Sequence, residues 1–216
     1  VDHAAMALWL APDHGVLVRI QRTLTEMDAH PARSVVLLPF AQLLPLAQRL
    51  WARQSPDGFA PRFETTLNWV NTLGAATWEP QNLTMDPAVD LLTAQRLVGR
   101  GGAGDRQEQA ALLLQAADQW APLAAAAGPA QRDAWAQTAR EHAALGMDSA
   151  ALAWEARLAR LAVEWVAASH YATDVLFLAS TWSNLDALVV VQGAVADPLS
   201  ASLAQHWGEK LRCLPL

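Results

Sequence analysis

Residues 185–207 read LDALVVVQGAVADPLSASLAQHW and set the architecture expected of the whole chain. The apolar run at 187–191 is rich in valine, which is typical of a strand buried on both faces of a parallel sheet. The run ends at Gln192 and Gly193, and Asp197, followed by proline, then begins a helix as its N-cap. Strand, short turn and helix form the unit of nucleotide-binding sheets, so the sequence predicts an α/β fold with a parallel sheet flanked by helices.

The end of this strand lacks the acidic residues of a working NTPase. In such an enzyme, carboxylates at that place hold Mg²⁺ and orient the attacking water. Gln192 and Gly193 fill the two places here, and an amide does not supply an anionic metal ligand. The sequence therefore predicts a nucleotide-binding architecture that has lost its chemistry.

The N-terminal junction between strand and helix lacks a phosphate-binding loop. Residues 4–10 are predicted to form the first strand and residues 15–27 the first helix. The residues that form the degenerate loop between them are Pro12, Asp13, His14 and Gly15. A P-loop would read GxxxxGK[ST], and Gly-Lys-Ser/Thr occurs nowhere in the chain. Asp13 is the predicted N-cap, and its charge at the helix start would repel a phosphate.

Strands and helices alternate through the rest of the expected α/β domain, and the centre of the chain is helical. The predicted α/β elements are strand 34–38, helix 41–54 with its start delayed by Pro45, strand 62–65, a helix capped by Thr65 or Thr66 and ended by Gly74, and a strand-like segment at 211–216. The predicted helices of the centre are 87–98, 107–126, 129–145 and 150–169. Segment 174–179 fits either a strand or a helix end, and the helix end is favoured. The expected domains are therefore 1–85 with 172–216, and an all-α insertion at 86–171.

Composition excludes several classes of protein. A net charge of -6 argues against a broad nucleic-acid footprint, although a local arginine patch remains open. The single cysteine, Cys213, excludes an internal disulfide and a cysteine-based zinc site. No stretch approaches the roughly 18–20 apolar residues of a membrane span, and the N-terminus lacks a secretory signal. We expect a cytoplasmic chain with no membrane partner, and its abrupt end predicts that the natural polypeptide continues.

No catalytic or metal-binding constellation is found in the sequence. The six histidines are scattered, and neither HExxH nor GxSxG occurs. Asp86 and Asp90 lie one helical turn apart, and capping of the helix explains the pair without catalysis. The tryptophans of the insertion sit at spacings that favour burial over base stacking. We therefore predict no catalytic residue, no metal and no cofactor in this chain.

The order of elements resembles the first RecA-like domain of superfamily 1 helicases. The first strand and helix occupy the Walker A place, and VVLLPFAQLLPLAQRL, residues 35–50, looks like motif Ia. FETTLNWVNTL, residues 63–73, resembles the segment that follows motif Ia, and LVVVQGAVADPLSASL, residues 188–203, lies at the Walker B place. The helical insertion sits where helicases place subdomain 1B. The resemblance implies a P-loop-NTPase-like sheet, and it implies DNA contacts at Pro39, Gln42, Arg62, Thr65 and Thr66.

More specifically, the chain is similar to the N-terminal region of AddB-type subunits of bacterial helicase–nuclease complexes, which are inactivated helicases. The strand–Gly–x–x–x–Asp-Pro–helix pattern at 187–200 is close to the one that such subunits show. The resemblance implies a PD-(D/E)xK nuclease much further along the natural protein, and a partner helicase–nuclease subunit. No nuclease motif falls within these residues.

Three functions remain open on the sequence alone. The first is a non-catalytic helicase-like module of DNA repair and recombination that scaffolds or guides single-stranded DNA or a duplex end. The second is a small-molecule enzyme on a doubly wound sheet, with a pocket built from the 11–15 and 192–195 loops. The third is a helical protein-interaction module. Because a fold does not establish a function, the first is preferred only on the resemblance.

Overall fold

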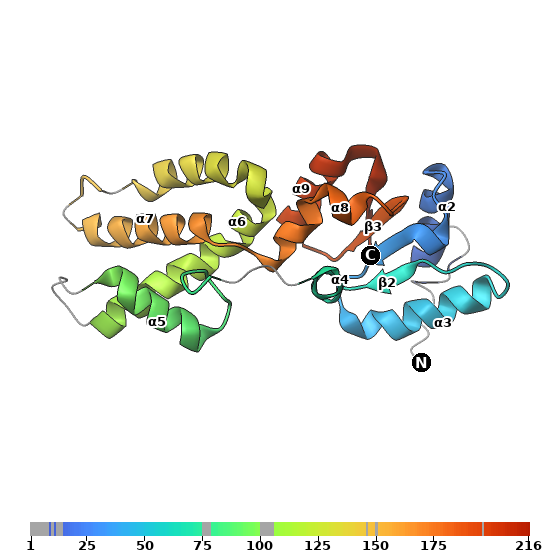
Figure 1. Cartoon of the computed structure of the whole chain (residues 1–216), viewed down its shortest axis with the longest axis horizontal. Helices are drawn as coiled ribbons and strands as arrows, with labels where there is room; N and C mark the ends of the chain where they lie inside the picture. The colour runs from blue at the N-terminus through green and yellow to red at the C-terminus, as the bar shows by residue number, and fades with distance from the viewer. Residues whose placement is uncertain are drawn as a thin grey trace. The chain divides into compact units, whose positions relative to one another are not determined.

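A computed structural model describes residues 9, 11, 15–74, 79–99, 106–145, 147–149, 151–195 and 197–216. The chain divides into two compact units, Val1–Gly74 with Val175–Leu216, and Ala75–Asp174 (Figure 1). The expected boundaries lay elsewhere, between residues 85 and 86 and between residues 171 and 172. One reason is that residues 79–83 pack within the second unit: Trp165 Nε1 donates to the Gln81 carbonyl, and the Leu83 amide donates to Ser169 Oγ.

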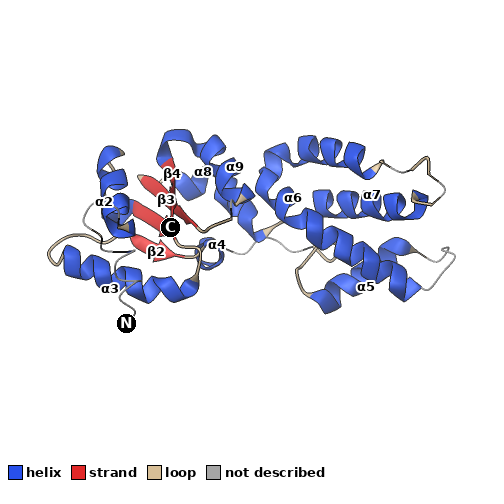
Figure 2. Cartoon of the chain, turned by 180° about the vertical axis from the view of Figure 1, so that it is seen from behind, coloured by secondary structure: helices blue, strands red, loops and turns tan. Residues whose placement is uncertain are grey.

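The first unit holds a four-stranded, all-parallel sheet, which confirms the predicted α/β fold (Figure 2). Its strands are β1 (Ser34–Leu37), β2 (Arg62–Glu64), β3 (Ala187–Gln192) and β4 (Leu211–Pro215), in the order β2-β1-β3-β4. In the register of the sheet, Val36 pairs with Val189 and Val190 pairs with Cys213. All of β1 and the first five residues of β3 are buried, which explains why the run at 187–191 is apolar without alternation.

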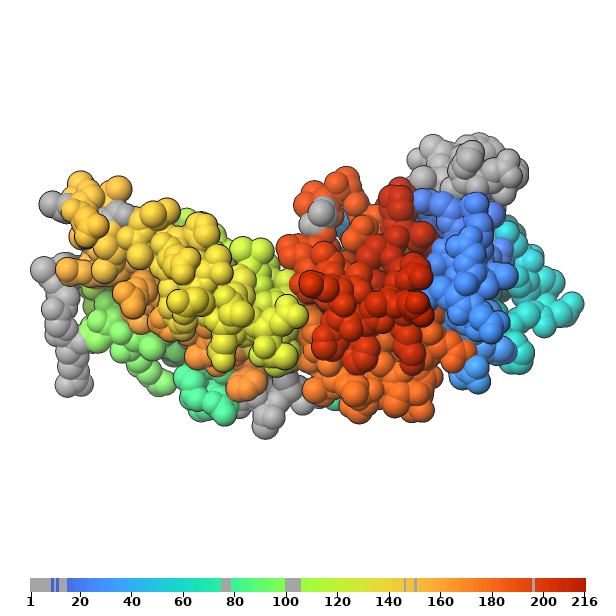
Figure 3. All heavy atoms as spheres, turned by 90° about the horizontal axis from the view of Figure 1, so that it is seen from above, coloured from blue at the N-terminus to red at the C-terminus, as the bar shows by residue number. Residues whose placement is uncertain are grey.

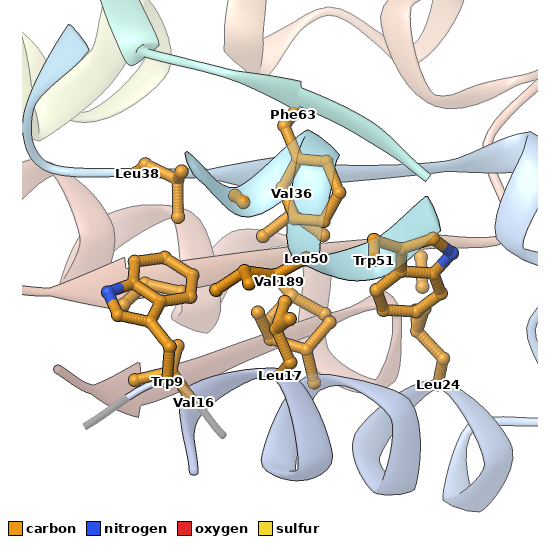
Figure 4. Packing of buried hydrophobic residues seen from close by; sticks show 14 residues of the cluster. Trp9, Val16, Leu17, Leu24, Val36, Leu38, Leu50, Trp51, Phe63 and Val189 are labelled. Carbon is orange, nitrogen blue, oxygen red and sulfur yellow. The ribbon is translucent and has the colours of Figure 1, made fainter. Parts of the chain in front are cut away.

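Two helices cover one face of the sheet. Side chains of α2 (Val16–Glu26) and α3 (Leu44–Gln54) pack on Val36, Phe63 and Val189 (Figure 4). A 3₁₀ turn, Ala41–Leu43, precedes α3, so Pro45 does delay the start of the α-helix as expected. The remaining helices of this unit are α4 (Thr66–Leu73), α8 (Ala179–Trp182) and α9 (Pro198–Trp207). In Figure 3 the red surface of the C-terminal segment adjoins the blue surface of α2, which contacts β4.

The start of α2 differs from the prediction. The N-cap is Gly15 rather than Asp13, and it makes no side-chain cap. Glycine is needed at this position because a Cβ would lie 2.6 Å from the Trp9 carbonyl oxygen. Trp9 is buried and has helical backbone, whereas the first strand was predicted there. The other residues of that strand, and Pro12, Asp13 and His14, lie outside the described residues.

Two stacked tryptophans join the C-terminal segments of the first unit. The rings of Trp182 and Trp207 stack with centroids 4.4 Å apart, at an angle of 22°. Both indole N–H groups donate to the same carbonyl, that of Leu176, at 2.7 and 3.0 Å. This pair fixes α8 and α9 to the turn that precedes α8, a 3₁₀ helix over Ala172–Phe177. The turn replaces the helix end expected at 174–179.

The second unit is helical in all of its described elements, α5 (Pro87–Val98), α6 (Arg106–Ala143) and α7 (Ala153–Ala168). Asp86 caps α5 by accepting from the amides of Ala88 and Val89, as predicted for a helix with proline in its first position. The helices expected at 107–126 and 129–145 are both present as the two arms of α6, which are separated at Gly128, where the backbone is not helical (φ 68, ψ 164), just before Pro129. α6 contacts both α5 and α7. None of the described helices has the length and hydropathy needed to cross a bilayer.

A buried ion pair lies beside the bend of α6. Arg132 is 5 % exposed and forms a bidentate pair with Asp174. Its Nε donates to the Ala124 carbonyl and its Nη1 to the Ser169 carbonyl. The guanidinium also lies 4.8 Å from the ring centroid of Tyr171. One side chain thus joins both arms of the bent helix to the end of the unit.

We expect Tyr171, the only tyrosine of the chain, to resist ionisation in the folded state. It is buried, and its hydroxyl donates to the Val166 carbonyl at 2.8 Å. Burial raises the pKa of the Tyr171 phenol, nearby Arg132 opposes this, and Asp174 adds to it. The neutral form is therefore favoured in the folded state. Above about pH 10 the unfolded chain binds fewer protons than the folded chain, so stability falls as pH rises, by up to about 1.4 kcal/mol per pH unit.

Absorbance at 295 nm measures this ionisation directly. The native chain should show no phenolate step near pH 10, whereas the chain unfolded in urea should titrate there. In Tyr171→Phe, the fall of the free energy of unfolding between pH 10 and 11 should be shallower. A native titration near pH 10 would show that the phenol is not buried.

Candidate functional site

A cleft opens at the carboxyl ends of β1, β2 and β3, with a volume of about 530 Å³. It is lined by residues 37–40 after β1, 65–67 after β2, and 190–191, 193–195, 197 and 200 from β3 to α9. The chain leaves β1 towards β2 on one side and leaves β3 towards β4 on the other. A crevice at such a reversal of strand order is where open parallel sheets bind their ligands.

The cleft brings together some of the predicted site residues. Pro39, Thr65, Thr66 and Gly193 line it. Gln192 ends β3 without lining the cleft, and its carbonyl accepts from the Leu216 amide at 2.8 Å. Of the two loops expected to form a pocket, residues 193–195 line this cleft, Ala11 and Gly15 do not, and residues 12–14 lie outside the described part of the chain.

Two of the predicted DNA contacts lie away from the cleft. Gln42 is exposed in the 3₁₀ turn before α3 and does not line the cleft. Arg62 begins β2, at the opposite end from the carboxyl edge. Its Nε donates to Glu64 Oε1 at 2.9 Å and its Nη2 to Thr72 Oγ1 at 3.2 Å. The side chain is thereby held along its own strand.

Two helix N-termini meet at the cleft, and they differ in charge. In α4, Thr65 caps only the Asn68 amide, through its neutral hydroxyl at 3.2 Å. In α9, the Asp197 carboxylate accepts from the amides of Leu199 and Ser200 and from Ser200 Oγ. A helix N-terminus attracts anions, but a carboxylate already placed there neutralises it. The start of α4 is therefore the end that suits an anionic group.

The rest of the cleft is apolar, and its rim is exposed. Phe40 is 56 % exposed, Leu67 63 % and Val195 82 %, and each follows a different strand. Among the described lining residues none is Lys, Arg or His. These three side chains were not predicted as site residues. The signal that could have identified them is an apolar residue in a strand-end loop, where polar residues are the rule.

Cys213 lies beside this cleft, opposite Val190 in the register of the sheet. Burial, and then the charge of Asp197, raise the pKa of its thiol. The thiol form therefore predominates at neutral pH, and a thiolate is the nucleophilic form. Within the described residues, no three His, Cys, Asp or Glu side chains converge as metal ligands would.

The geometry suits binding of a ligand that has one flat apolar part and one anionic group. The apolar part would rest against Phe40 and Leu67, and the anion would meet the amides of α4. Comparison of the chain with protein-family models, with curated proteins and with solved structures finds no match.

Proposed function

We propose that this chain is a non-catalytic, degenerate helicase-like module that guides single-stranded DNA. On this proposal the sheet is of the RecA-like, P-loop-NTPase-like kind, and the protein serves in repair and recombination beside a partner helicase–nuclease subunit. Two features of the fold support it. The strand at the Walker B place is β3, whose first five residues are buried, and it ends at Gln192, which Gly193 follows. The all-α unit is inserted between β2 and β3, as the resemblance implies.

The observation that carries the proposal is the cleft with its two unlike parts. A nucleotide within a single strand offers one phosphate and one base. The start of α4, which is capped by the neutral hydroxyl of Thr65 and carries no carboxylate, suits the phosphate, and the exposed ring of Phe40 offers a stacking platform for the base. Because the lining described in the structure has no cation, binding relies on stacking more than on phosphate contacts.

The same cleft is poorly suited to a triphosphate. Asp197 places a carboxylate at the start of α9, where it would repel the phosphates. The chain has no Gly-Lys-Ser/Thr to hold them. We therefore expect MgATP neither to bind in calorimetry nor to displace DNA.

Fluorescence anisotropy of a labelled 15-nucleotide oligo(dT), at low and moderate salt, tests the proposal. We expect binding that weakens only slightly as salt rises, because the described lining has no cation, and that weakens about tenfold in Phe40→Ala because one stacked base is lost. The matched control is Phe59→Ala, since Phe59 is 65 % exposed but does not line the cleft.

A second variant tests the phosphate contact. Thr66→Glu places a carboxylate in the first turn of α4, which stabilises the helix but repels a phosphate. Weaker DNA binding without loss of stability is the expected result. The proposal fails if oligo(dT) does not bind even at low salt, or if Phe40→Ala and Phe59→Ala bind alike.

A second candidate function is binding of a free small molecule in the same cleft. Its volume, about 530 Å³, lies in the usual range for such sites, roughly 300–1,000 Å³. Chain length separates the two candidates. Competition by a mononucleotide as strong as by oligo(dT) would favour the small molecule.

A further inference from the structure

An apolar stripe in the helical unit begins just before α5 and continues along the exposed side of that helix. Met85 is 61 % exposed, Val89 44 % and Leu92 58 %. A step of three residues places Val89 and Leu92 on one face of α5, Arg96 continues the same face, and Met85 precedes the N-cap of the helix. A helix face normally buries its apolar side chains, so this stripe indicates a surface that a partner covers.

The two ends of the stripe carry opposite charge. A pocket of about 220 Å³ adjoins Met85 and is also lined by Asp90 and Asp118. Asp90 is buried and accepts from the Thr84 amide and hydroxyl, so the carboxylate at the surface is that of Asp118, whose pKa is raised by burial and then by the charge of Asp90. At the other end, Arg96 is exposed in the last turn of α5. The stripe is thus acidic at its start, apolar in its middle and basic at its end.

We propose that α5 binds α5 of a second copy of this chain, in antiparallel orientation about a two-fold axis. The surface has an acidic end, an apolar middle and a basic end. When a second copy is reversed, its basic end meets the acidic end of the first copy, so the surface is complementary to itself. In a two-fold interface the contact that one copy makes is repeated by the other. Each Arg96 then meets the acidic pocket of the opposite copy.

The spacing along the helix agrees with this pairing. With the axis midway between Val89 and Leu92, Val89 faces Leu92 of the second copy. Arg96, about 8 Å along the helix from the axis at 1.5 Å per residue, then lies opposite the N-terminal end of α5 of the second copy. The basic side chain therefore lies over the pocket that holds Asp90 and Asp118, where it meets the carboxylate of Asp118.

Sedimentation equilibrium of the whole chain between about 20 µM and 1 mM tests the pairing. A single helix face buries less than a standard interface, so we expect a reversible dimer with a Kd of roughly 100 µM or weaker. Leu92→Glu should raise the Kd by at least about tenfold. The matched control is Leu123→Glu, since Leu123 is 41 % exposed on α6 and is not part of the stripe. A chain that stays monomeric at 1 mM overturns the proposal.

Charge reversal tests the register. Arg96→Glu should weaken the dimer about tenfold, because the two-fold axis counts each ion pair twice. Asp118→Arg added to Arg96→Glu should restore it, whereas Glu141→Arg added at an exposed acid of α6 should not. Failure of that rescue overturns the register. Phe40→Ala should dimerise like the unmodified chain, so the result does not depend on whether DNA binds the cleft.

Discussion

Replacing Arg132 by methionine lowers the free energy of unfolding of the helical unit by about 3–5 kcal/mol, the usual loss when one partner of a buried ion pair is removed. The variant leaves Asp174 charged and 13 % exposed without its cation. It also removes the donors that satisfy the carbonyls of Ala124 and Ser169. Urea unfolding followed by circular dichroism at 222 nm measures the loss, since α5, α6 and α7 dominate the helical signal.

The same helix offers a matched control. Arg140 also forms a bidentate pair, with Glu164 at 2.7 and 2.9 Å, but the two side chains are 33 % and 45 % exposed. Exposed pairs contribute at most about 1 kcal/mol, so Arg140→Met should change stability little. If both variants lose the same stability, the burial of Arg132 is not what makes its pair important.

The second large effect is expected at Trp182. Replacing Trp182 by alanine should destabilise the first unit by about 3–5 kcal/mol, because a buried indole leaves a cavity. Trp182 is 2 % exposed, and the change also removes the stack on Trp207 and one of the two donors to the Leu176 carbonyl. Near-UV circular dichroism during thermal unfolding reports the loss of this stacked pair.

Phe40→Ala is the control for Trp182→Ala, because it also truncates an aromatic residue of the first unit. Phe40 is 56 % exposed, so its removal leaves no cavity and should cost less than about 1 kcal/mol. A large loss in Phe40→Ala would mean that its ring is part of the core. Any effect of that variant on DNA binding could then not be assigned to stacking.

Local sequence signals predicted the elements whose structure is determined locally. The valine run at 187–191 is β3, Asp197 caps α9, and Thr65 caps α4. The helix end favoured at 174–179 is replaced by a 3₁₀ turn, because tertiary contacts hold the segment: Asp174 pairs with Arg132, and the Leu176 carbonyl accepts from two tryptophans. Gly128-Pro129 signalled the break that separates the two helical arms of α6, and the non-helical backbone at Gly128 confirms it.

The candidate site was predictable only in part, because its parts come from segments far apart in the chain. Pro39, Thr65, Thr66 and Gly193 follow strands that sequence patterns identify, but the lateral order of the strands decides that they share one cleft. Arg62 was expected to contact DNA because it is an arginine and lies beside the segment, residues 63–73, that resembles a helicase. Its hydrogen bonds with Glu64 and Thr72 hold it away from the cleft, and no local pattern shows such pairing.

The pairing of β1 with β3 has a consequence for how the chain folds. Arg33 and Asp186, which form an ion pair at the start of these strands, are 153 residues apart in the sequence. Closing so long a loop is entropically unfavourable, and contacts of high sequence separation form slowly. The intervening helices make mostly local contacts and suit early folding, which would bring the two strands closer. We therefore expect the central pairing of the sheet to be the slow step, and the edge of β1 that faces β3 to remain unpaired until β3 has been synthesised.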